Sequence, residues 1–188
     1  MGLDMYLYTN SRKLSKEVHE GQPYGEFCTD WYRKEGIVMY WRKANAIHKW
    51  FVENAQGGND DCGTYEVYPE QLSELRDLCK RIIDECPLVD GTVSMGKHYE
   101  NGRWVDDFEN GKVLSNWELA EELLPTQSGF FFGSTSYDQW YYSDVKWTYE
   151  ELDRILSMLK NVKDGWAEVL RMKGEPDWNV RFYYHSSW

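Results

Sequence analysis

Two apolar periodicities alternate along this chain of 188 residues, and they restrict the folds that it can adopt. Near the start, Leu3, Met5 and Leu7 alternate with more polar residues, which is the period of a half-buried β-strand. Residues 69–86 instead carry apolar side chains three and four positions apart, which is the period of an amphipathic helix. Because both periods recur without a regular strand–helix–strand repeat, we predict an α+β fold.

The Gly and Pro residues between these periodic segments set the expected element boundaries. We expect strands at residues 3–8, 64–68, 130–132 (FFF) and 178–188, and helices at 41–55, 69–86, 116–124 and 148–163. Thr148 is the expected N-cap of the last helix, with Glu151 completing a capping box. Residues 10–35 and 88–115 are expected to be long loops or hairpin inserts. The prediction is one domain, residues 1–188, with a mixed or antiparallel sheet packed against three or four helices.

The formal net charge of -11 opposes binding to a phosphate backbone. We therefore expect no affinity for duplex DNA at physiological salt, although a local basic pocket for a small anion remains compatible with this charge. A gel shift that shows submicromolar binding to random duplex DNA at that salt would contradict this expectation.

The cysteines and histidines offer no pattern typical of a metal site. Cys28, Cys62, Cys79 and Cys86 form no C-x-x-C pair, and no His stands at zinc-like spacing beside them. We expect reduced thiols, no metal and no cofactor. No basic leader precedes the first strand and no apolar run approaches the length of a bilayer span, so we expect a cytoplasmic protein with no membrane partner.

The segment YWRKANAIHKWF, residues 40–51, places polar groups beside core-forming groups. On a helical wheel, Ala44, Ile47 and Phe51 form the centre of the buried stripe. Two interpretations remain open for the polar residues at its border: they bond to nearby backbone, or they rim a ligand pocket with Trp41 or Trp50 as a stacking wall. The border residues are Lys43, His48, Trp50 and Asn54. Arg42, Asn45, Lys49 and Glu53 point away from the centre of the stripe, and of these Arg42, Lys49 and Glu53 are expected to be solvated.

A second cluster lies in FFFGSTSYDQWYYSD, residues 130–144. The expected strand runs into Gly133, Ser134 and Thr135, and Thr135 is a candidate cap for a short helix with Asp138 at its N3 position. Free backbone N–H groups at such a corner suit a phosphate or a carboxylate. The alternative is a capped corner with a buried aromatic stripe. The aromatic and acidic residues at helical spacing are Tyr137, Trp140, Tyr141 and Asp144.

The chain resembles a family of small phage- and prophage-encoded proteins. The resemblance is carried by GLDMYL at residues 2–7, by the YWRKANAIHKWF segment and by FFFGSTSYDQWYY at 130–142, and it spans most of the chain outside residues 88–115. It implies a viral or prophage origin and the host bacterial cytoplasm as the place of action. By analogy with small early phage proteins, it also suggests a role against host defence, such as sequestering a nucleotide second messenger.

Three hypotheses for function follow. The first is a binding module that encloses a nucleotide-like ligand; its candidate ligand-binding residues are Trp41, Lys43, His48, Trp50, Asn54, Gly133, Ser134, Thr135, Tyr137 and Tyr141. The second is an enzyme acting on such a ligand, with His48 or His185 as general acid or base. The third is an inhibitor that binds a host protein, or a phage structural accessory. A homo-oligomer is compatible with all three.

Overall fold

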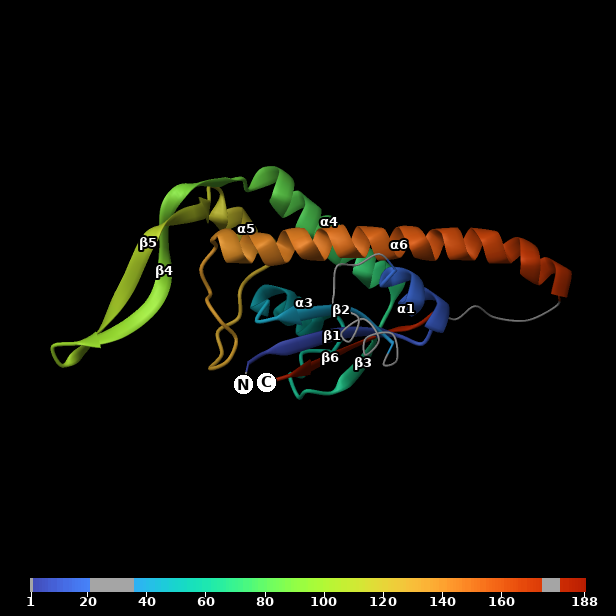
Figure 1. The fold of residues 1–188 in the computed structure, drawn as a ribbon, viewed down its shortest axis with the longest axis horizontal. Coiled ribbons are helices and arrows are strands. Elements are labelled where there is room, and N and C mark those ends of the chain that lie inside the picture. The colour runs from blue at the N-terminus through green and yellow to red at the C-terminus, as the bar shows by residue number, and fades with distance from the viewer. Residues whose placement is uncertain (1, 21–35, 174–179) are drawn as a thin grey trace.

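A four-stranded antiparallel sheet forms one layer of the fold (Figure 1). The structure, a computed structural model, describes residues 2–20, 36–173 and 180–188. β1 (Asp4–Thr9) lies between β2 (Ile37–Arg42) and β6 (Phe182–Ser187), and β3 (Thr64–Val67) pairs with β6 at its other edge. The helices α3 (Asn45–Asn54), α4 (Pro69–Glu85) and α6 (Gln139–Lys173) lie on one side of this sheet (Figure 1). The predicted α+β fold is confirmed.

The alternation at the start of the chain sets which face of the sheet is buried. Leu3, Met5 and Leu7 are fully buried, as predicted from their period of two. β6 adds Phe182 and Tyr184 to the same core, because β1 and β6 pair antiparallel in register. The two ends of the described chain therefore lie next to each other (Figure 1).

The helical layer is built mainly from α4 packed along α6. α4 begins with Pro69 in its first turn, where a missing N–H costs no helical hydrogen bond. Its predicted stripe is confirmed at Leu72, Leu75, Cys79 and Ile82, which are all buried. The short helix α5 (Trp117–Leu123) follows the hairpin and ends just before Pro125.

Residues 88–114 form a long two-stranded hairpin, which is one of the two forms predicted for residues 88–115. β4 (Leu88–Glu100) and β5 (Arg103–Leu114) pair antiparallel and project beyond one end of the helical layer (Figure 1). Their connection is Asn101–Gly102, and both residues have positive φ. Asn-Gly is the dipeptide that best fits a tight hairpin turn, because that turn needs two left-handed residues.

The predicted helix at 41–55 is wrong at its start. Residues through Arg42 belong to β2, where Trp41 pairs with Met5, and α3 begins only at Asn45. The backbone N–H of Lys43 donates to the carbonyl of Leu3 at 2.7 Å, so strand pairing extends past the end of β2. Pairing with a neighbouring strand outweighed the local helical period, which is a common override of weak propensity.

The predicted N-cap at Thr148 is also wrong, because Thr148 lies inside α6. Its hydroxyl donates to the Asp144 carbonyl at 2.7 Å and accepts from the Trp41 indole N–H at 2.8 Å. The cap is Asp138 instead of Thr148 or Thr135. Its Oδ1 accepts from the backbone N–H groups of Trp140 at 2.9 Å and Tyr141 at 3.2 Å.

Two further local predictions fail. The expected buried strand at 130–132 is a turn, in which Phe130 is 93% exposed while Phe132 is buried. The expected loop at 10–35 contains a helix, α1 (Arg12–Val18), whose Ser11 hydroxyl accepts from the Leu14 N–H at 3.2 Å. Residues 21–35 and 178–179 lie outside the described part of the chain.

Three of the four cysteines can be placed, and all three are free thiols: Cys62, Cys79 and Cys86. Burial raises the pKa of the Cys79 thiol, so this group acts as a small apolar side chain in the core. Cys28 is outside the described residues. Among the described residues, every helix is too short or too polar to span a bilayer.

Candidate functional site

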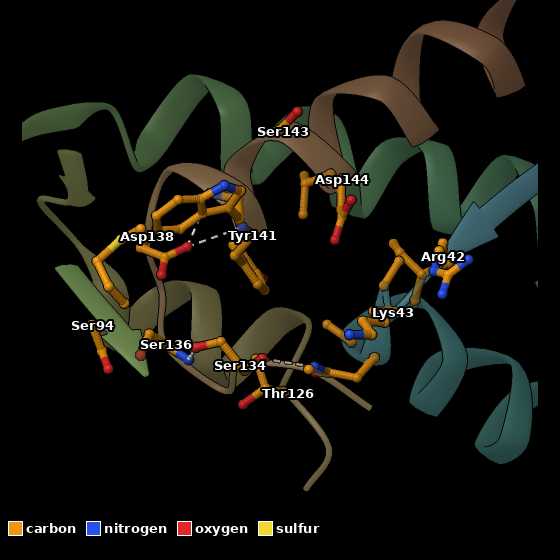
Figure 2. A pocket seen from close by; sticks show the side chains of 18 residues that line it. Arg42, Lys43, Ser94, Thr126, Ser134, Ser136, Asp138, Tyr141, Ser143 and Asp144 are labelled. Carbon is orange, nitrogen blue, oxygen red and sulfur yellow. Dashed lines mark hydrogen bonds between the residues drawn. The ribbon is translucent and has the colours of Figure 1, made fainter. Parts of the chain in front are cut away.

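A cavity of about 450 Å³ opens where the two polar clusters of the sequence meet (Figure 2). Its walls come from the junction of β2 and α3, from the segment 126–138 and from the first turns of α6. Ser94 and Met95 of the hairpin complete it. The volume is in the range of roughly 300–1,000 Å³ that is typical of small-molecule sites.

Arg42 and Lys43 form the basic side of the cavity. Lys43 has a φ of 61°, a left-handed conformation that is uncommon for a residue with a side chain. Gly133 packs against it with a φ of 89°, and a Cβ on Gly133 would lie only 3.2 Å from the Lys43 Cβ. Glycine is therefore needed at 133 both for its backbone angle and for its close approach to Lys43.

Asn45 joins the two clusters, although the helical wheel predicted that it would point away from the centre of the buried stripe. Its amide nitrogen donates to the carbonyls of Phe132 at 3.0 Å and Ser134 at 2.7 Å, and its oxygen accepts from the Gln127 N–H at 3.0 Å. Asn45 is only 5% exposed. It thus holds the segment 126–138 against the first turn of α3 and shapes the cavity floor.

Two carboxylates form the acidic side of the cavity. Asp138 uses Oδ1 to cap α6, and its buried Oδ2 has no hydrogen-bond partner among the described residues. Asp144 lies nearly two turns further along α6 and is partly buried. Burial, and then the negative charge of Asp138, raises the pKa of the Asp144 carboxyl to about 7. A carboxyl that titrates near neutral pH is a candidate for ligand binding or proton transfer.

Two aromatic side chains of α6 also line the cavity. Tyr141 is buried, and its hydroxyl donates to the Leu124 carbonyl at 2.9 Å, which fixes the ring. Trp140 also lines the cavity and is 45% exposed, so part of its indole is accessible. The exposed ring offers a stacking surface for a flat ligand.

Four of the ten predicted ligand-binding residues line the cavity: Lys43, Gly133, Ser134 and Tyr141. Six do not. Trp41 and Trp50 are buried in the core, Asn54 is exposed at the far end of α3, and Thr135 is exposed beside the cavity. Tyr137 packs against Tyr141, with ring centroids 4.9 Å apart.

His48 belongs to a buried polar network rather than to the cavity. Its Nδ1 lies 2.7 Å from the Tyr184 hydroxyl and its Nε2 lies 3.1 Å from Asp60 Oδ2. Asp60 also accepts from the Gln127 side chain at 3.3 Å and from the Trp188 indole at 3.0 Å. Burial lowers the pKa of His48, so a structural role for the neutral imidazole fits its surroundings.

Five charged, amide or aromatic residues that line the cavity were not among the ten predicted ligand-binding residues: Arg42, Asn45, Asp138, Trp140 and Asp144. The helical spacing noted in the sequence already grouped Trp140 with Asp144, because they are four residues apart and share one helix face. Arg42 and Asn45 gave no such signal, since their placement depends on where β2 ends.

No group of three or more His, Cys, Asp or Glu side chains in the described ranges is placed to hold a metal ion. Comparison with known proteins gives no relative: no family model, curated protein or solved structure matches the chain. The chemistry of the cavity is therefore the basis for assigning a function.

Proposed function

We propose that the protein binds a small, anionic, nucleotide-like ligand in this cavity. The observation that carries the proposal is the pair of cations at its basic side. Both side chains line the cavity, and within the described part of the chain their charged groups have no hydrogen bond or ion pair, although the Arg42 charge also acts on the Tyr6 and Tyr40 hydroxyls of the sheet. A phosphate can accept charge-assisted hydrogen bonds from both groups. Trp140 supplies a face on which a base can stack, a contact worth about 1–3 kcal/mol in single-stranded nucleic-acid complexes.

We further propose that the bound ligand is sequestered. A phage or prophage origin, which we propose from the sequence resemblance alone, would fit this role, with a host defence second messenger, such as a cyclic nucleotide or an ADP-ribose derivative, as the ligand. A thermal-shift screen of cyclic dinucleotides, ADP-ribose derivatives and mononucleotides tests binding, because a ligand that binds only the folded state raises the melting temperature. If no compound of this panel shifts the melting temperature, the nucleotide proposal is contradicted.

Arg42→Ala and Lys43→Gly should each weaken the binding of a ligand found in that screen by at least about tenfold, since a charge-assisted bond contributes roughly 1.5–3 kcal/mol. Lys43→Gly should not lower stability, because glycine adopts a φ of 61° without steric cost. Titration calorimetry and thermal unfolding measure the two effects.

Lys49→Ala is the matched control for these variants. Lys49 is a cation on α3 that does not line the cavity, and its Nζ lies 3.9 Å from Glu53 Oε1. Its replacement should leave ligand affinity unchanged. If Lys49→Ala weakens binding as much as Arg42→Ala does, the ligand responds to overall charge and not to this cavity.

Catalysis is a second candidate, favoured by the raised pKa of Asp144. The predicted general acids or bases do not line the cavity: His48 is in the core, and His185 lies on β6 with its ring 6.2 Å from that of Tyr6. Asp144 is the residue that could move a proton in this cavity. Chromatography after incubation and heat denaturation separates the candidates, because binding returns the intact nucleotide and catalysis returns a new product.

Binding to a host protein is a third candidate, favoured by the hairpin. Tyr99, Trp104 and Phe108 share one face of β4–β5 and are 64%, 68% and 63% exposed. Exposed aromatic rings gathered on one face are typical of protein-binding surfaces. Affinity capture from infected cells with the wild-type protein and a Trp104→Ala variant tests this, because a hairpin-bound partner should be lost with the variant.

A further inference from the structure

Three charged side chains around the cavity lack partners. Arg42, Lys43 and Asp144 have neither a hydrogen bond from their charged groups nor an ion pair within the described part of the chain. Figure 2 shows the Asp144 carboxylate directed from α6 into the cavity, with Arg42 and Lys43 on the α3 side. Opposite charges thus face one cavity without neutralising each other. Asp144 is half-buried, where an unpaired charge is unfavourable, whereas Arg42 and Lys43 are exposed, so a ligand that donates to Asp144 and accepts from the two cations would pair with both sides.

Both oxygens of the Asp144 carboxylate are available to such a ligand. The Thr148 hydroxyl donates to the backbone carbonyl of Asp144 and not to its carboxylate. The neighbouring Asp138 brings a second negative charge and no donor, and its Oδ1 is already occupied by the N–H groups that begin α6. An ionised carboxylate only accepts hydrogen bonds, so Asp144 selects a ligand group with N–H donors.

We propose that the cavity recognises a ligand with two adjacent N–H donors on one edge and an anionic group at the other end. Asp144 accepts the two N–H donors, and Arg42 and Lys43 bind the anion. This inference rests on the proposed function and names the ligand class for the same site. The Trp140 ring also lines the cavity and is 45% exposed, so it provides a stacking face for a flat ligand.

Among nucleotides, this chemistry favours guanine over adenine. Guanine carries a ring N–H beside an exocyclic amino group, which matches the two oxygens of a carboxylate. Adenine carries a ring acceptor beside its amino group, so the ionised Asp144 would face a lone pair. Sites built around a specific hydrogen bond reject analogues that cannot make it. Free arginine shares the donor pair and the anion, so it is the alternative source of the same chemistry.

The test measures the binding of GMP, AMP and arginine by titration calorimetry near pH 8, to the wild-type protein, Asp144→Asn and Glu150→Gln. We expect the wild type to bind GMP at least tenfold more tightly than AMP. Asp144→Asn should remove or reverse that preference, because an amide presents one donor and one acceptor and pairs well with adenine. Glu150 is an exposed carboxylate on α6 outside the cavity, so Glu150→Gln should keep the wild-type preference.

The other possible binding results decide separately on the donor-pair inference and on the nucleotide proposal. Equal binding of GMP and AMP by the wild type, or an unchanged preference in Asp144→Asn, overturns this inference and leaves nucleotide binding intact. Binding of arginine without GMP, lost in Asp144→Asn, supports the donor-pair chemistry and overturns the nucleotide proposal. If none of the three ligands binds, the donor-pair inference is overturned, and the second-messenger screen then decides the proposed function separately. The thermal melt of Asp144→Asn near pH 8 confirms that the variant is folded.

Discussion

Replacing Asp144 by Asn should raise the free energy of unfolding by about 2 kcal/mol near pH 8 and change it little near pH 4.5. The pKa of the Asp144 carboxyl is raised to about 7 by burial and then by the charge of Asp138. In the unfolded chain, an aspartate titrates near pH 3.9. The folded state therefore holds more protons between about pH 4 and pH 7, and its stability falls as the pH rises through this window.

The size of the effect follows from the width of that window. A rise in the pKa of Asp144 from about 3.9 in the unfolded chain to about 7 in the folded protein corresponds to about 4 kcal/mol of lost stability when the carboxyl is fully ionised. Asp144 is only partly buried, so we take about half of that value to allow for solvent screening. The neutral amide of Asn does not ionise, so the variant should escape this loss of stability above pH 7.

Urea denaturation of the wild type and Asp144→Asn at pH 4.5, 6 and 8 measures the difference. The comparison is needed because His48 acts in the opposite direction: burial lowers its pKa, so stability is lost as the pH falls below about 6.5. Both proteins contain His48, and its contribution cancels. Glu150→Gln is the control and should show no pH-dependent gain. A pH-independent effect of Asp144→Asn would mean that Asp144 is already ionised and solvated in the folded protein.

Asn45→Ala should lower the free energy of unfolding by about 2–4 kcal/mol, because three hydrogen bonds are lost and their buried partners are left unsatisfied. Those partners are the carbonyls of Phe132 and Ser134 and the N–H of Gln127. Without Asn45, the segment 126–138 is no longer held to α3, so ligand binding should weaken as well. Chemical denaturation and calorimetry measure the two effects.

Asn54→Ala provides a matched control on the same helix. The Asn54 side-chain amide donates one hydrogen bond of 2.8 Å to the Trp50 carbonyl within α3, and the residue is exposed. Its loss should cost less than about 1 kcal/mol. If Asn45→Ala and Asn54→Ala are equally mild, the segment 126–138 is held to α3 by packing rather than by the Asn45 amide.

Local sequence patterns were sufficient to predict those elements whose apolar side chains all pack against the same layer of the fold. The alternation at Leu3, Met5 and Leu7 predicted β1, and the stripe from Leu72 to Ile82 predicted α4 and its buried face. In both cases, burial of apolar area favours the same side chains that the period selects. Pro69 marked the beginning of α4, because proline fits the first turn of a helix.

Tertiary structure decided the elements in which local and long-range interactions compete. The YWRKAN segment has a helical period, but pairing of Trp41 with Met5 makes its first residues a strand. That change of boundary removes Trp41 from the proposed pocket and turns Lys43 left-handed against Gly133. Thr148 resembles an N-cap, yet the helix extends past it because Asp138 caps an earlier start.

The sequence alone determined that polar and aromatic groups gather in two segments, 40–51 and 130–144, since this is a matter of composition along the chain. Only the tertiary structure decided that the two segments meet and which of their residues face the cavity. Asn45 bonds to carbonyls 87 and 89 residues away, and His48 turns instead toward Tyr184 in the core. Such contacts depend on strand order and helix rotation, which no period in the sequence encodes, because each is set by the packing of elements far apart in the chain.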